Sequence, residues 1–165
     1  MNDPRIGYQA GRTPLNNVIS FLERVAEAAP GRVALHWLPA ERKAAWLADQ
    51  GAPLAHETMS YGELAGAVRA AASGLARLGI GEGDRVFLFV PMSPALYIAM
   101  FAVQRLGAVA VFAESWTRPE SLGHCARLVA AKAMVAPEQA YQFVATVPGL
   151  ELPPVRIAVG PHAGT

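Results

Sequence analysis

The chain has 165 residues, of which 53% are hydrophobic and 16% are charged, and its formal net charge is +1. This composition excludes a disordered chain, and the length suffices for one core or for one part of a larger enzyme. The fourteen basic residues are scattered among acidic and apolar ones, so the dense basic patch typical of nucleic-acid binding is absent from the sequence.

Reactive side chains form no catalytic or metal-binding pattern. The single cysteine, Cys125, excludes an internal disulfide and indicates a reducing compartment. On a helix its neighbour His124 would point about 100° away, which disfavours a Cys–His pair. Because His36, His56 and His162 share no metal-ligand spacing, we expect no metal site and no catalytic residue in this chain.

Nothing in the sequence indicates export or a membrane span. The first residues contain no apolar core of a secretory signal. The longest apolar stretch, residues 94–103, is too short to cross a bilayer as a helix. We therefore expect a cytoplasmic protein.

Residues 1–15 are expected to be flexible, and the ordered part to begin with a helix. Apolar residues between 18 and 25 fall on one helical face, which Asn16 or Asn17 could cap and Pro30 would end. Residues 33–37 and 54–59 then have the pattern of two strands. They can pair as an antiparallel hairpin across a polar, proline-bounded connection with a helical turn around residues 44–48.

The segment SYGEL at residues 60–64 has the spacing of a capping box. The Ser60 hydroxyl can accept from the N–H of Glu63 while the Glu63 carboxylate accepts from the N–H of Ser60. One apolar stripe then follows at alternating spacings of four and three: Leu64, Val68, Ala71, Leu75 and Leu78. Gly79 stands where a helix C-cap glycine is expected, so the sequence predicts a helix of about five turns.

From residue 85 onward, strands and helices alternate. Apolar strands are expected at 85–90, 108–112, 133–136 and 155–159. Helices are expected at 94–106, with Ser93 as N-cap and Pro94 at the first position, at about 117–131, with Thr117 and Glu120 as a second capping box, and at 138–146. This alternation predicts an α/β fold with a mostly parallel sheet of right-handed βαβ units covered by helices on both faces.

The glycine-rich segment GIGEGD at residues 79–84 raises the question of a phosphate-binding loop. Such a loop follows a strand and opens a helix, because phosphate binds at the helix N-terminus. GIGEGD instead follows a helix and precedes a strand, and no GKS or GKT comes after it. A helix-to-strand turn in which glycines adopt positive φ is the better interpretation.

Acidic residues occur where α/β proteins often bind ligands. Glu114 and Glu120 follow an expected strand, at the carboxyl edge of the sheet. Either could contact a ligand, although Glu120 is better explained as a cap of its own helix.

Three motifs occur together in order: MSYGEL, GIGEGDRV and RLGAVAVF. In this order and spacing, together with Pro91–Pro94 between the last two, the sequence resembles the N-terminal part of the adenylate-forming superfamily over residues 16–147. This superfamily includes acyl-CoA synthetases, aryl-CoA ligases, luciferases and peptide-synthetase adenylation domains. The branch it is most similar to is the fatty acyl-CoA synthetase-like ligases, including those of long-chain olefin pathways.

The resemblance implies a longer enzyme that uses ATP, Mg²⁺ and CoA to activate a carboxylic acid, expected to be a fatty acid. Residues 16–160 would be its N-terminal α/β subdomain and residues 161–165 the start of a linker. The family's Ser/Thr/Gly-rich phosphate loop and its catalytic lysine have no counterpart here, so the chain alone is expected to be inactive and to bind none of these cofactors tightly. Candidates to line the acyl site are Tyr97, Met100, Phe101, Glu114 and Trp116.

Some features leave alternatives open. Where the family usually continues with prolines after the strand, this chain has FAESW at residues 112–116, which puts contacts at this loop in doubt. The four apolar or aromatic pocket candidates have a competing interpretation, because apolar residues at helical spacing are more often core residues than pocket residues. The chain could also be a stand-alone, non-catalytic Rossmann-like binding or assembly module, and a nucleotide-dependent oxidoreductase is disfavoured by the context of GIGEGD. If the downstream part of its own chain is missing, the exposed face is expected to favour self-association.

Overall fold

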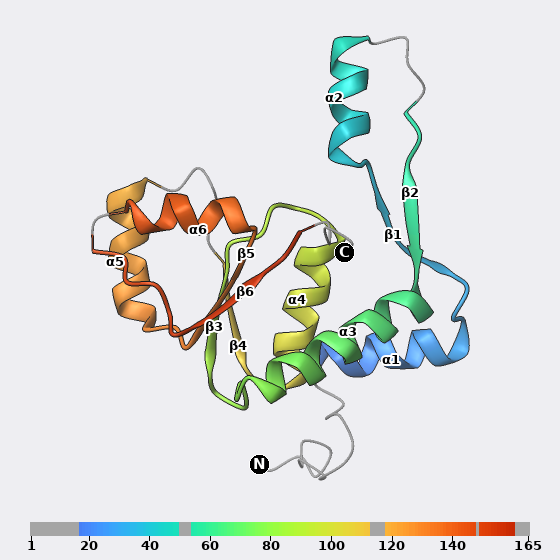
Figure 1. The fold of residues 1–165 in the computed structure, drawn as a ribbon. Coiled ribbons are helices and arrows are strands. Elements are labelled where there is room, and N and C mark those ends of the chain that lie inside the picture. Colours follow the sequence, from blue (N-terminus) through green and yellow to red (C-terminus); the bar gives the residue numbers. More distant parts are fainter. Residues whose placement is uncertain (1–16, 50–53, 113–117, 148, 161–165) are drawn as a thin grey trace, which may run out of the picture.

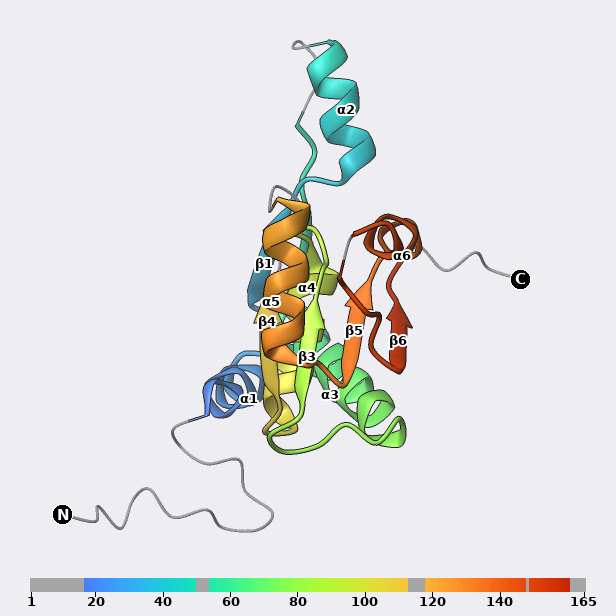
Figure 2. The ribbon, with the colours of Figure 1, turned by 90° about the vertical axis from the view of Figure 1, so that its left-hand side faces the viewer.

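A parallel sheet of four strands forms the centre of the molecule. The computed structural model describes residues 17–49, 54–112, 118–147 and 149–160. The strands lie in the order β4-β3-β5-β6, and all three pairings are parallel, as the sequence predicts (Figure 2). Their bounds are β3 Arg85–Leu88, β4 Val109–Phe112, β5 Ala133–Ala136 and β6 Val155–Ala158.

Helices cover both faces of this sheet, which confirms the expected layers (Figure 1). On one face lie α1 (Val18–Ala28), α3 (Tyr61–Arg77) and α4 (Pro94–Arg105). On the other lie α5 (Pro119–Val129) and α6 (Glu138–Ala145). Because α4 joins β3 to β4 on one face and α5 joins β4 to β5 on the other, the sheet is wound in both directions.

The two faces of β3 feed two separate cores. Val86 and Leu88 are buried against α3 and α4, together with Val103 of α4. Phe87 points the other way and is buried with Met134, under α5 and α6. Side chains of a strand alternate between faces, so a strand covered on both faces must be apolar at every position.

An antiparallel hairpin, separate from the parallel sheet, extends from the end of α1 and the start of α3 and carries a helix at its far end (Figure 1). Its strands are β1 Val33–Trp37 and β2 Glu57–Ser60, and the helix between them is α2 Ala40–Ala48. The expected hairpin is confirmed, but its connection holds a full helix, and β2 starts at residue 57 instead of 54. Before β2, the guanidinium of Arg42 donates to the carbonyl of Ala55 at 2.8 Å.

The capping box at the start of α3 is present as predicted. The N–H of Glu63 donates to the Ser60 hydroxyl at 3.2 Å, and the N–H of Ser60 donates to the Glu63 carboxylate at 2.8 Å. These hydrogen bonds from Ser60 lower the pKa of Glu63.

The backbone of Gly62, in the first turn of α3, lies close to the chain that follows α1. Its N–H donates to the Pro30 carbonyl at 2.9 Å, and a Cβ on Gly62 would lie 3.1 Å from that oxygen. A glycine here therefore lets α3 start directly against the end of α1.

At the other end of α3, one residue of the predicted stripe lies outside the core. Leu64, Val68 and Leu75 are buried, whereas Leu78 is 51% exposed. The helix ends at Arg77, and Leu78 occupies the C-cap position beyond the last buried turn. Gly79 follows with φ of 80°, as a C-cap glycine requires.

Two predicted helix starts differ from expectation. Ser93 occupies the N-cap position of α4, but its hydroxyl donates to the carbonyl of Pro91 at 2.9 Å and makes no capping bond. Pro94 begins the helix as predicted, and its missing N–H reduces the need for a cap. Helix α5 begins at Pro119 with Arg118 in the N-cap position. The predicted box of Thr117 and Glu120 involves side chains outside the described residues.

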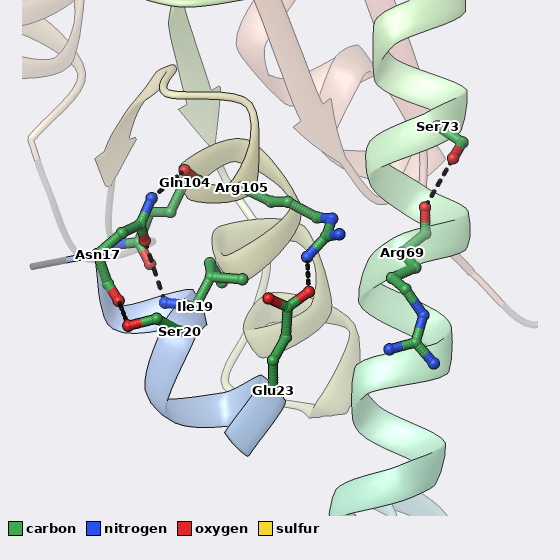
Figure 3. A network of polar contacts seen from close by, with 8 residues as sticks. All are labelled: Asn17, Ile19, Ser20, Glu23, Arg69, Ser73, Gln104 and Arg105. Carbon is green, nitrogen blue, oxygen red and sulfur yellow. Dashed lines mark hydrogen bonds and ion pairs between the residues drawn. The ribbon is translucent and has the colours of Figure 1, made fainter. Parts of the chain in front are cut away.

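Polar contacts join the start of α1 to the end of α4 (Figure 3). The Asn17 side chain accepts from the N–H of Ile19 at 3.0 Å, which identifies Asn17 as the cap. Its amide group also donates to the backbone carbonyl of Gln104 at 3.2 Å. One turn further along α1, Glu23 forms an ion pair with Arg105. Two contacts therefore hold α1 against the end of α4: one from the N-cap residue of α1 and one from a side chain within α1.

Substitutions of Asn17 are expected to separate these two roles. Asn17→Ser keeps a capping oxygen and loses the bond to Gln104, whereas Asn17→Ala loses both. We expect Asn17→Ala to lower the free energy of unfolding by about 1.5 kcal/mol and Asn17→Ser by about 0.5 kcal/mol, measured by urea denaturation. Equal losses for the two variants would contradict the capping role.

Tyr141 of α6 fastens the edge strand β6 to the sheet. Its hydroxyl oxygen lies 2.7 Å from the carbonyl oxygen of Met134 in β5, and accepts from the N–H of Ile157 in β6 at 3.0 Å. Burial raises the pKa of this hydroxyl.

Candidate functional site

The GIGEGD loop has the geometry of a turn. It lies between the end of α3 at Arg77 and the start of β3 at Arg85, so no helix N-terminus faces it. Gly79 and Gly83 have φ values of 80° and 76°, a region that favours glycine. The N–H of Gly81 donates to the Asp84 carboxylate at 2.8 Å, and that of Gly83 donates to the Gly107 carbonyl at 3.0 Å. The loop thus directs its amide groups to the protein itself.

Lys132 completes the closure of this loop. Its ammonium group donates to the Gly79 carbonyl at 2.6 Å and to the Asp84 carboxylate at 2.7 Å. The bond from Lys132, followed by the bond from Gly81, lowers the pKa of Asp84. The turn is therefore tied to the residue before β5, and the Lys132 ammonium neutralises the Asp84 carboxylate.

This cluster predicts an acid-sensitive contribution to stability. A carboxyl group whose pKa is lower in the folded chain than in the unfolded chain stabilises the fold at pH values above its unfolded-state pKa. This contribution to stability is lost as the pH falls through the folded-state pKa. Urea denaturation should show the wild-type chain losing stability below about pH 4. Asp84→Asn and Lys132→Met should each lose less over the same interval, because the first removes the carboxyl and the second removes the larger of the two bonds that lower its pKa. A variant curve parallel to that of the wild type would contradict this assignment.

The carboxyl edge of the parallel sheet is the place where this topology can form a ligand site. The connection after β3 leads to α4 on one face, whereas those after β4 and β5 lead to α5 and α6 on the other (Figure 1). Neighbouring connections that diverge in this way open a crevice beyond the strand ends. Residues just after β3 border this position: Phe89 and Val90 are buried, and Met92 is 76% exposed.

Three of the predicted pocket residues lie on α4, which starts at this edge. Tyr97 and Phe101 are four positions apart, so they share one side of the helix with Met100. Met100 packs partly buried against the core between α3 and the sheet, whereas Phe101 packs against the core shared by α1 and α3. Tyr97 is half-buried. The other two candidates, Glu114 and Trp116, lie outside the described residues.

Long-range polar contacts were not predicted from the sequence. Lys132 and Asp84, like Asn17 and Gln104, lie far apart in the chain, and no local spacing links them. Arg127 is a further case, since its guanidinium donates to the Gly149 carbonyl at 3.0 Å. Of these residues, only Asn17 could be identified from its neighbours in the sequence, because an asparagine just before an apolar helix is a typical N-cap.

Among the described residues, no group of three or more His, Cys, Asp or Glu side chains could hold a metal ion. The sequence has two lysines, and one of them, Lys132, is held by Asp84 and Gly79. Within the same described segments, no helix is long and apolar enough to cross a membrane.

A doubly wound parallel sheet with helices on both faces defines an α/β domain. The family described as AMP-binding enzyme matches this chain over residues 22–159. The chain therefore belongs to the AMP-binding enzyme family, as its three motifs predicted.

Curated relatives extend well beyond the matched region. The salicyl-AMP ligase / salicyl-S-ArCP synthetase of Mycobacterium tuberculosis is 36% identical over 137 residues, covering 83% of this chain and 21% of that protein. The olefin beta-lactone synthetase of Xanthomonas campestris is 33% identical over 120 residues, covering 73% of this chain and 20% of that protein. The chain thus spans about a fifth of the length of these relatives.

Solved structures confirm the fold. The fatty acid AMP ligase from Legionella pneumophila aligns with a TM-score of 0.66 at 20% identity, covering 86% of this chain and 23% of that one. The N-terminal subdomain of Klebsiella oxytoca NpsA, in complex with 3-hydroxybenzoyl-AMSN, aligns with a TM-score of 0.64 at 25% identity, covering 87% and 30%.

Proposed function

We propose that this chain is the N-terminal part of an ATP-dependent ligase that joins a carboxylic acid to a thiol. The carboxylate would attack the α-phosphate of ATP, giving an acyl-adenylate and pyrophosphate. A thiol, which we propose to be CoA, would then displace AMP and form a thioester. The observation that carries this proposal is the family match over residues 22–159, in a chain whose matched part covers about a fifth of the length of its relatives.

Within that ligase, we propose that residues 16–160 form an α/β subdomain with a supporting role. Its sheet would fix α4, and Tyr97, Met100 and Phe101 would line one wall of the acid site, with Glu114 and Trp116 near its entrance. We propose a fatty acid as the substrate, because α4 offers this wall an apolar sequence, PALYIAMFAV. Catalytic groups would come from a downstream part of the chain, and the reaction would take place in the cytoplasm.

An exchange assay tests the division of roles. The 165-residue chain is expected to give no acid-dependent exchange of labelled pyrophosphate into ATP above a blank without protein. The product of the whole gene should give exchange that depends on the acid. Exchange by the 165-residue chain alone would contradict the supporting role and would require a phosphate site within it.

A panel of acids and thiols tests the substrate. Decanoate, salicylate and acetate represent fatty, aromatic and short acids, and exchange should be fastest with decanoate. Thioester formation with CoA, compared with a carrier protein, tests the acceptor. Absence of exchange with every acid would favour the alternative, a non-catalytic binding or assembly module.

A further inference from the structure

An apolar groove runs between α3, α4 and the edge strand β6. It has a volume of about 570 Å³. Its walls include Leu78 at the end of α3, Ala95 near the start of α4, and Ile157 and Val159 at the end of the sheet. Among the residues described as lining it, Arg77 is the one charged side chain.

The shape of the groove suits a segment of polypeptide. Many of its lining residues are small, including Ala71, Gly74, Ala99 and Ala158, so an incoming backbone can approach the helices closely. The adjacent strand β6 pairs with β5 on one side, and within the described residues no strand pairs with its other side. In β6, the side chains of Arg156 and Ala158 are exposed. An open strand edge beside an apolar groove is a surface that proteins normally cover.

We infer that a downstream segment of the same protein covers this groove. The inference rests on the proposed function, in which this chain is one part of a longer ligase. The matched segments cover only about a fifth of the length of these relatives, so a downstream segment is available in proteins of this family. Val159 and Gly160 line the groove themselves, and the chain therefore leaves β6 at the docking surface. A segment joined to Gly160 by a short connection would have a high effective concentration there.

The chemistry of the groove specifies the occupant. An apolar helix or strand with at most one acidic side chain, placed opposite Arg77, would match the lining. Such a segment would remove Leu78 from water, although this residue is 51% exposed in the present structure. Leu78, the exposed last residue of the apolar stripe along α3, would then lie in the interface with this segment.

Two leucines in matched settings test this inference. Leu78 and Leu128 each follow an arginine at the end of a helix, and they are 51% and 69% exposed. Leu78 lines the groove, whereas Leu128 lies on α5 on the opposite face of the sheet. Leu78→Glu and Leu128→Glu should be made both in the 165-residue chain and in the product of the whole gene, and the Tm of each protein measured.

In the 165-residue chain, both variants should shift Tm by no more than about 2 °C, as exposed substitutions do. In the product of the whole gene, Leu78→Glu should lower Tm by about 5 °C or more, because it places a charge in a covered interface, and Leu128→Glu should again have little effect. Equal effects of the two variants in the whole protein would overturn the inference.

Two further readouts separate the other outcomes. The first readout is sedimentation of the 165-residue chain and of the whole protein. If both form dimers and Leu78→Glu dissociates them, the groove binds a second copy and the inference is overturned. Stabilisation of the wild-type chain by decanoate, lost in Leu78→Glu, would assign it to an acid and overturn the inference. Pyrophosphate exchange by the wild-type whole protein is measured separately, so loss of the proposed function is distinguishable from loss of the docking contact.

Discussion

Replacing Val103 by Asp is expected to remove the cooperative unfolding transition of the chain. Val103 is 0% exposed and lies where α4 meets α3 and the parallel sheet. A carboxylate at this position would be buried without a partner, at a cost of about 4 kcal/mol or more. Domains of this size have a total stability of about 5–15 kcal/mol, so most of it would be lost.

Circular dichroism on heating provides the measurement, and two variants provide the controls. Val103→Thr keeps the volume and adds one hydroxyl, so it should lower stability by about 1–3 kcal/mol and retain a sharp transition. Leu128→Asp places the same charge on an exposed helical position and should have little effect. A sharp transition near the wild-type Tm for Val103→Asp would contradict the burial of this helix face.

Truncation of Met134 is the second large effect that we expect. This residue is 0% exposed in β5 and packs with Phe87 and Leu122 under α5 and α6. Met134→Ala would remove its buried side chain and leave a cavity, lowering the free energy of unfolding by about 2–5 kcal/mol. Urea denaturation at neutral pH should show this as a lower midpoint with an unchanged slope.

Met134→Leu serves as the control for volume. It retains most of the apolar volume and should cost less than about 1.5 kcal/mol. If alanine and leucine had the same effect, the loss would not come from packing. Val103 and Met134 probe opposite faces of the sheet, so together the variants test both cores.

Features set by neighbouring residues were predicted best from the sequence. The capping box of Ser60 and Glu63 and the positive φ of Gly79 involve residues within a few positions of each other, and both are confirmed. Leu78 shows the limit of periodicity, because a stripe can continue past the point where the core ends. Ser93 shows another limit, since its hydroxyl had a second acceptor, the Pro91 carbonyl.

Features that join distant segments could not be predicted. The position of β3 between β4 and β5 depends on which crossover lies on which face, and the strand patterns do not encode this order. The bond from Lys132 to Asp84 depends on that strand order. For the candidate site, the apolar pattern of α4 indicated burial but not which of its residues pack against which core.

The strand order also constrains how the chain folds as it is synthesised. β3 and β4 are close in sequence and can pair as soon as residue 112 has emerged, whereas the other edge of β3 must wait for β5, which ends at Ala136. During this interval β3, which is apolar on both sides, has one open edge. Nascent chains of this family would therefore gain most from chaperone contact between the synthesis of β4 and that of β5.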